Sequence, residues 1–192
     1  MITTKEYLEA YKDSMQSVPQ DIHSKEAVIE YNKELVKKYP WLVPGYVGFL
    51  EPEESYDYED TWADDIPSGW RLAFGDQMIE ELDQLIKKYG VEDYGIYQIK
   101  EKWGILRWYD NGFPEEGYKE YSKWLRRYES LSEHTCIFCG EPAKYLTKGW
   151  IAPICKACVE KEGYSESSLT LLDSSEESTT NREDNTDEYN HK

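Results

Sequence analysis

Histidine is scarce in this sequence, and the common nucleotide-binding and hydrolase motifs are missing from it. The three histidines are His23, His134 and His191, too few to assemble easily a His-based nucleophile or a hydrolytic metal site. The chain contains no GxxxxGK[ST], GxGxxG, GxSxG or HExxH motif. These absences predict a protein that is not an enzyme. A metal site made only of carboxylates from residues 51–65 stays open as an alternative.

Long apolar runs are also absent. No stretch reaches the roughly 18 apolar residues that a transmembrane helix needs, and residues 1–6 (MITTKE) turn polar at once, unlike a secretory signal. We therefore expect a cytoplasmic protein. Thiols stay reduced in that compartment, so closely paired cysteines indicate a metal site more strongly than disulfides.

Basic residues are missing or sparse in two strongly acidic runs. Residues 51–65 hold eight acids and no Lys or Arg, and residues 164–192 hold eight acids against Arg182 and Lys192. The runs carry −8 and −6 of the formal net charge of −17, which leaves −3 for the rest. Acidic surfaces repel nucleic acids and favour basic proteins; the alternative is that these acids are simply solvated. The candidate partner-binding residues are Glu51, Glu53, Glu54, Asp57, Glu59, Asp60, Asp64 and Asp65.

The four cysteines form the clearest site pattern in the chain. Their spacing is C-x2-C-x15-C-x2-C, with Gly140 after the first pair. Four thiolates at about 2.3 Å complete a tetrahedral Zn²⁺ site without an open position for water, which is typical of a structural ion. Residues 143–147 and 150–154 should form a hairpin, which gives a zinc ribbon over 133–163; disulfides or free thiols are the alternatives. His134 could replace one cysteine, but we expect it to end a helix. The predicted ligands are Cys136, Cys139, Cys155 and Cys158.

The remaining pattern predicts an α+β fold, with a helical body and one β-hairpin over residues 1–132. We expect helices over about 3–15, 24–39, 76–89 and 114–131, and hairpin strands over 94–100 and 104–109. Residues 41–50 read as an apolar loop packed on the core, and 164–192 as an acidic, disordered tail. The last helix should bury one stripe made of Tyr118, Tyr121, Trp124, Leu125, Tyr128 and Leu131.

Three segments together resemble small proteins of phages and bacterial mobile elements. These segments are IKEKWGILRWY (99–109), CIFCG (136–140) and GWIAPIC (149–155). The family carries a similar basic and aromatic stretch ahead of a paired-cysteine knuckle, and the resemblance covers about residues 94–160. It implies a phage-encoded protein acting in the host bacterial cytoplasm, and it supplies no catalytic residues.

Two functions fit these patterns. The first is a non-enzymatic inhibitor, of an anti-defence or anti-CRISPR type, whose acids bind a basic nucleic-acid-handling protein of the host. The second is a zinc-ribbon accessory factor that binds nucleic acid itself. The plain alternative to the second is that the tryptophans pack in the core while the lysines face water. The candidate nucleic-acid-binding residues are Lys100, Lys102, Trp103, Arg107 and Trp108, with Arg126 and Arg127 as further phosphate contacts.

Overall fold

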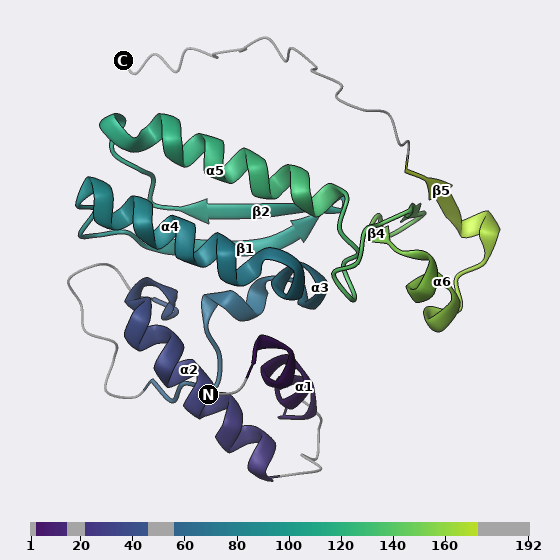
Figure 1. Cartoon of the computed structure of the whole chain (residues 1–192), viewed down its shortest axis with the longest axis horizontal. Helices are drawn as coiled ribbons and strands as arrows, with labels where there is room; N and C mark the ends of the chain where they lie inside the picture. Colours follow the sequence, from purple (N-terminus) through teal and green to yellow (C-terminus); the bar gives the residue numbers. More distant parts are fainter. Residues whose placement is uncertain (1–2, 15–21, 46–55, 173–192) are drawn as a thin grey trace, which may run out of the picture.

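The computed structural model describes residues 3–14, 22–45 and 56–172, and it confirms the α+β fold (Figure 1). The α-helices are α1 Thr4–Ser14, α2 Ile22–Lys38, α3 Ser68–Trp70, α4 Asp76–Tyr89, α5 Glu115–Glu133 and α6 Lys156–Glu162. The strands are β1 Ile96–Lys102, β2 Ile105–Asp110, β3 Tyr145–Thr147, β4 Pro153–Ile154 and β5 Leu169–Leu171. Three 3₁₀ turns, η1 Pro40–Leu42, η2 Trp62–Asp65 and η4 Glu166–Ser168, and one π-helical turn, η3 Arg71–Gly75, complete the elements.

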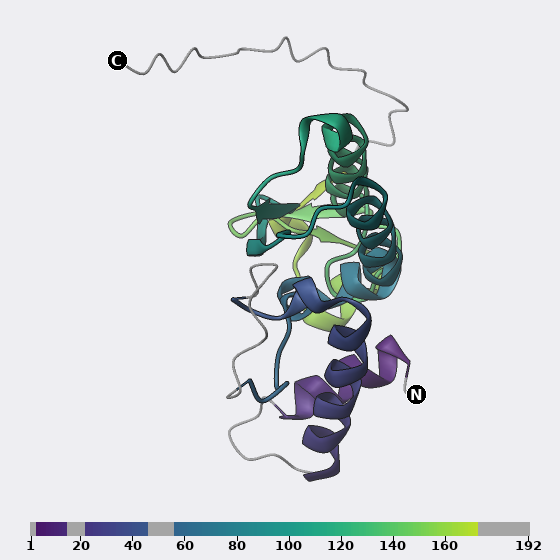
Figure 2. The same cartoon turned by 90° about the vertical axis from the view of Figure 1, so that its left-hand side faces the viewer.

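The centre of the body is the antiparallel β1–β2 hairpin, which lies on one side of α4 and α5 (Figure 2). Its inner face buries Ile99, Leu106 and Trp108. The Trp108 ring meets the Trp124 ring of α5 edge to face, with the centroids 5.4 Å apart. Because a two-stranded sheet is only marginally stable alone, this aromatic packing against the helices is what holds the hairpin.

Helix α4 has the bounds that the sequence predicts. Its apolar residues Met78, Ile79, Leu82 and Ile86 fall on one helical face and are all buried. The helix ends at Gly90, whose φ of +61° is the left-handed conformation that glycine adopts without strain. At its start, α3 and the π-helical turn lead directly into α4, an extension that the sequence analysis did not predict.

Helix α5 buries a narrower stripe than predicted. Tyr121, Trp124 and Tyr128 are buried, but Tyr118 is 58% exposed and Leu131 38% exposed. At 100° per residue these two side chains lie at opposite edges of the stripe, and the hairpin is too narrow to cover both edges. Their assignment to the core is therefore wrong.

The hairpin turn is shorter than predicted. Strand β1 runs on through Lys102, which pairs with Ile105, so only Trp103 and Gly104 form the connection. Both residues have positive φ, +60° and +76°, as a two-residue type I′ turn requires. Trp103 is unusual at this position because bulky side chains rarely adopt positive φ.

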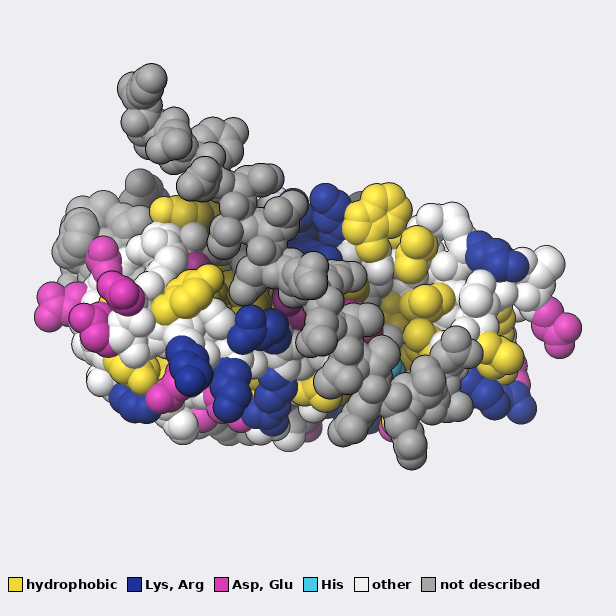
Figure 3. Space-filling view, turned by 90° about the horizontal axis from the view of Figure 1, so that it is seen from above, with side chains coloured by type: hydrophobic (Ala, Val, Ile, Leu, Met, Phe, Trp, Pro, Cys, Tyr) yellow, Lys and Arg dark blue, Asp and Glu magenta, His cyan; other side chains and the backbone are white. Residues whose placement is uncertain are grey.

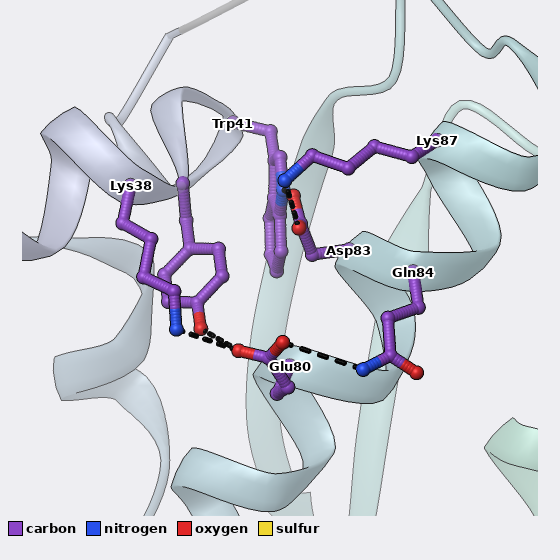
Figure 4. Close-up of polar contacts among 7 residues, drawn as sticks. Lys38, Trp41, Glu80, Asp83, Gln84 and Lys87 are labelled. Carbon is purple, nitrogen blue, oxygen red and sulfur yellow. Dashed lines mark hydrogen bonds and ion pairs between the residues drawn. The ribbon is translucent and has the colours of Figure 1, made fainter.

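Polar side chains join the end of α2 to α4 (Figure 4). Glu80 accepts hydrogen bonds from the Lys38 ammonium, at 2.6 Å, and from the Tyr39 hydroxyl. The Lys38 bond is the main reason that the pKa of Glu80 falls to about 2. One turn further along α4, the buried Asp83 pairs with Lys87 at 2.6 Å and accepts a long bond from the Trp41 indole, 3.4 Å.

The apolar loop predicted for residues 41–50 is confirmed over its first part. Trp41, Leu42 and Val43 are buried, and η1 provides the turn that carries them into the core. Residues 46–50 lie outside the described part of the chain.

Candidate metal centre and interaction surfaces

The first cysteine pair lies on a tight turn just after α5. The Gly140 amide donates to the Cys136 carbonyl at 3.0 Å, and Gly140 closes the turn with a φ of +83°. His134 lies at the C-terminal cap of α5, where its Nδ1 is 3.1 Å from the Ser130 carbonyl oxygen. It therefore ends the helix, as predicted.

The second pair is held differently, at the start of a helix that the sequence analysis did not predict. Cys155 is the N-cap residue of α6, and its Sγ accepts a hydrogen bond from the Cys158 amide at 3.4 Å. Cys158 follows in the first turn of the helix. The site thus combines one turn and one helix N-terminus, whereas a ribbon would use two similar turns.

The four thiols converge on one point. Their sulfur atoms all lie within 4.8 Å of one another, and the Sγ atoms of Cys139 and Cys155 are 3.5 Å apart. Sulfurs in a tetrahedral zinc site lie about 3.8 Å apart, whereas a disulfide needs about 2.05 Å. The arrangement fits one metal ion and contains no disulfide.

Burial and hydrogen bonding act in opposite directions on these thiols. Burial raises the pKa of Cys139 and of Cys158. Burial also acts on Cys155, but the hydrogen bonds from the Cys158 amide and the neighbouring thiols outweigh it and lower the pKa of Cys155. Because thiolates are the metal ligands, a bound cation would favour ionisation of all four.

A small antiparallel sheet surrounds the cysteines and extends past the predicted boundary. Strands β3 and β4 pair as the expected hairpin, and β5 adds a third strand on the other edge of β3. We call residues 134–172 the four-cysteine unit. Residues 164–172 belong to it and not to a tail, because Leu169–Leu171 complete the hydrogen bonding of β3. The rest of the predicted tail, 173–192, lies outside the described residues.

The unit packs on the body chiefly through the start of α3. The Gly69 amide donates to the Ile137 carbonyl at 2.9 Å, and the Trp70 indole donates to the Thr135 carbonyl at 2.9 Å. Ile137 and Ala152 are part of the main hydrophobic core. The sequence analysis expected docking through Trp150, but that side chain is 51% exposed.

Trp150 instead touches the tip of the β1–β2 hairpin. Its indole donates to one carboxylate oxygen of Glu101 at 2.8 Å, and the other oxygen accepts from the Gly104 amide at 2.6 Å. The Trp150 ring also packs edge to face on Phe138. One carboxylate therefore links the hairpin turn to the four-cysteine unit.

The acids of the first acidic run have different roles. Asp64 accepts hydrogen bonds from Tyr7 and from the amide and hydroxyl of Thr61, which makes it a capping residue of η2. Glu59 pairs with Lys25 at 2.5 Å. The Asp57 carboxylate accepts from the Glu59 amide at 3.0 Å. The other predicted members Glu51, Glu53 and Glu54 lie outside the described residues.

Asp57, Asp60 and Asp65 remain exposed on this segment. Partial burial and then the neighbouring carboxylates raise the pKa of Asp60 and of Asp65. Within residues 3–14, 22–45 and 56–172, the cysteine cluster is the only set of three or more His, Cys, Asp or Glu side chains placed to share an ion. The described acids therefore form a negative surface without the geometry of a carboxylate metal site.

The predicted basic strip is divided between two faces of the hairpin. Trp108 is buried, and its indole donates to the Tyr94 hydroxyl at 2.8 Å, so its assignment to a nucleic-acid surface is wrong. Arg107 pairs with Glu129 of α5 at 3.0 Å. Lys102 and Trp103 are exposed, with Trp103 64% exposed. Strand alternation could have separated Trp108 from its neighbours, and it would have replaced Trp108 by Tyr109.

The additional phosphate contacts predicted on α5 also differ from each other. Arg127 pairs with Glu81 of α4 at 3.0 Å. Arg126 is exposed on the outer side of the helix.

Comparison with known proteins identifies no relative: no family model, no curated protein and no solved structure matches the chain. The resemblance to phage and mobile-element proteins therefore stays a prediction. In the described part of the chain, every helix is too short or too polar to cross a lipid bilayer.

Proposed function

We propose that this protein is a non-enzymatic, zinc-containing interaction protein that binds a basic surface of a nucleic-acid-handling protein in a bacterial host and inhibits it. An anti-defence or anti-CRISPR protein would be one such inhibitor. The observation that carries the proposal is the fixed position of the exposed acids over residues 57–65. They belong to a segment that is hydrogen-bonded to the body on both sides of the charges.

Three contacts hold this segment. Thr61 and Asp64 form the reciprocal hydrogen bonds of a capping box, and the Tyr7 hydroxyl of α1 binds Asp64 at 2.5 Å. The Tyr56 hydroxyl donates to the Asp60 carbonyl at 2.5 Å. Carboxylates that are already positioned lose less conformational entropy on binding than those of a loose chain, which favours an interaction surface over simply solvated charges.

The electrostatics support a cationic partner. The raised pKa values of Asp60 and Asp65 reflect, after partial burial, repulsion from neighbouring carboxylates. An arriving Lys or Arg would relieve that repulsion, and the negative field would speed the encounter. A groove that normally holds DNA or RNA presents such basic side chains, so this surface would compete with the nucleic acid.

We assign the metal as Zn²⁺ and its role as structural. Four cysteine ligands are typical of structural zinc and leave no coordination position for a substrate. The ion would fix the turn at Cys136–Cys139 against α3 and the start of α6 against the small sheet. Its contribution is to the folding of the four-cysteine unit.

The test is an affinity pull-down from nuclease-treated bacterial lysate, followed by mass spectrometry and an inhibition assay on the recovered target. The wild-type chain is compared with the triple variant Asp57→Asn, Asp60→Asn, Asp65→Asn, which spares the structural Asp64. The matched control is Glu92→Gln, Asp93→Asn, Glu116→Gln, which removes the same charge from exposed positions near the opposite end of the hairpin.

We expect one nucleic-acid-handling protein to be recovered stoichiometrically with wild type and control, and to be lost or weakened at least tenfold with the triple variant. Full binding by the triple variant would refute the acidic surface as the docking site. A second triple variant, Glu51→Gln, Glu53→Gln, Glu54→Gln, measures the contribution of the remaining predicted acids.

A further inference from the structure

The outer face of the β1–β2 hairpin is strongly basic in an otherwise acidic protein. The register places Lys100 opposite Arg107 and Lys102 opposite Ile105. Two contacts show that Lys100 shares this face with Tyr109 and Gln98: its ammonium lies 5.1 Å from the centre of the Tyr109 ring and donates to the Gln98 side chain. We call this the outer sheet face; its six residues are Gln98, Lys100, Lys102, Ile105, Arg107 and Tyr109.

The two acids of the strands are excluded from that face. Glu101 is engaged by the Gly104 amide and the Trp150 indole. Asp110 accepts hydrogen bonds from the hydroxyls of Tyr94, at 2.7 Å, and Tyr121. The outer sheet face thus carries three cations and no acid, although the whole chain has a formal charge of −17. Only Glu129 of α5 reaches it from a neighbouring element, through its ion pair with Arg107.

Aromatic rings accompany these cations. Tyr109 is 43% exposed on the face itself, and Trp103 is 64% exposed at its end. Trp103 also adopts a positive φ, where asparagine or glycine is usual. Folding gains little from an exposed indole in a conformation that costs a non-glycine residue about 1–2 kcal/mol. Such an outlier supports a role in binding.

We propose that the outer sheet face, together with Trp103, binds single-stranded nucleic acid. Lys100 and Lys102 would contact phosphates, with Arg107 beside them, while the Trp103 ring would stack on an unpaired base. Cations combined with exposed aromatic rings are the chemistry by which proteins hold single strands without sequence readout. In a duplex the bases are already stacked on each other, so an exposed indole offers a duplex no equivalent contact.

This binding surface is distinct from the acidic segment, so the protein could contact both a nucleic-acid-handling partner and the strand that the partner holds. The two proposals fail separately. Loss of partner binding in the Asp57, Asp60, Asp65 variant concerns only the acidic segment, and the variants described next concern only the outer sheet face.

The experiment measures fluorescence anisotropy of labelled 20-nucleotide dT and mixed-sequence RNA probes with the zinc-loaded full chain, over a range of salt concentrations. The variants are Trp103→Asn, which keeps a residue suited to positive φ, and the double variant Lys100→Gln, Lys102→Gln. The matched control is Lys119→Gln, Lys123→Gln, which removes two exposed lysines from α5, where basic side chains gather in the view of Figure 3. Zinc content and circular dichroism verify that each variant is folded.

We expect binding at low salt, a loss of about tenfold for Trp103→Asn, and a salt dependence whose slope falls by about 1.4 for the lysine double variant, about 0.7 per phosphate contact. The α5 control should bind like wild type. Absence of binding at low salt, equal binding of a 20-base-pair duplex, unchanged binding by Trp103→Asn, or equal losses in control and double variant would each overturn the proposal. So would loss of partner protein in a pull-down with Trp103→Asn while probe binding is unchanged, since the face would then be a protein contact.

Discussion

Gly69 and Cys136 are in direct backbone contact, so that a Cβ atom on Gly69 would lie 2.2 Å from the Cys136 carbonyl oxygen. The contact joins the start of α3 to the first cysteine turn. Gly140 approaches the same place from the other side, where its Cβ would lie 2.7 Å from the Gly69 carbonyl oxygen. Two glycines 71 positions apart thus allow the body and the four-cysteine unit to touch through their backbones.

The first prediction concerns this contact. Gly69→Ala should lower the free energy of unfolding by about 1–3 kcal/mol or more, because neither backbone can yield without moving α3 or the cysteine turn. It should also weaken metal retention against a chelator. Gly149→Ala is the control, since its Cβ would meet nothing within 4 Å and adds only the strain of a φ of +85°. Equal chemical-denaturation midpoints for the two variants would contradict the prediction.

The metal site gives the second prediction. Cys155→Ser should reduce bound zinc from one ion per chain toward zero, measured by elemental analysis, because a hydroxyl is a poor substitute for thiolate in a four-sulfur site. Since Ile137 and Ala152 lie in the main core, loss of the ion should also lower the thermal midpoint of the body. Lys156→Ser, at the adjacent exposed position, should leave both quantities unchanged. Unaltered zinc content in Cys155→Ser would refute the assignment.

Glu80 makes stability depend on acid pH. Its folded pKa of about 2 lies below its ordinary value of 4.5, so the folded state favours the carboxylate and gains stability above pH 4.5. This gain is lost as pH falls from 4.5 through 2. Glu80→Gln should be less stable at pH 7 and should show a shallower loss over that interval in acid titrations of unfolding. Glu34→Gln, an exposed acid 4.0 Å from Lys37, should follow the wild-type curve.

The acidic segment should respond in opposite directions to two similar substitutions. Asp64→Asn should destabilise by about 1–2 kcal/mol, because it weakens the cap of η2 and the Tyr7 contact. Asp65→Asn should stabilise at pH 7, because the pKa of Asp65 is raised and its ionised form is disfavoured in the folded state. That gain should disappear below about pH 4, where the aspartate itself becomes protonated. Urea unfolding at pH 7 and pH 3.5 measures both effects.

Trp103 tests the separation of binding from folding. Trp103→Asn should leave the protein as stable or raise its free energy of unfolding by up to about 1 kcal/mol, since asparagine tolerates positive φ better than tryptophan. Trp108→Asn on the adjacent strand should destabilise strongly, because Trp108 is buried against Trp124. A large thermal destabilisation by Trp103→Asn would show that the indole is needed for folding.

The sequence by itself determined the elements with strong local signals. The helical period of residues 76–89 and the glycine that follows them define α4 because both act within a few residues. The cysteine spacing indicated the metal site for a similar reason: two C-x2-C turns hold their thiols close whatever the rest of the chain does. The acidic run was also visible, since charge is a property of composition.

Only the tertiary structure decided which side chains share a surface. Trp103 and Trp108 stand in one sequence motif, yet the alternation of β2 and the position of α5 bury one and expose the other. Asp64 and Asp65 are adjacent, but contacts with Tyr7 and Thr61 make only Asp64 structural. Strand β5 pairs with β3 across more than twenty residues, and the close approach of Gly69 to Cys136 spans more than sixty. Such contacts depend on the packing of distant elements, for which no local pattern in the sequence gives a signal.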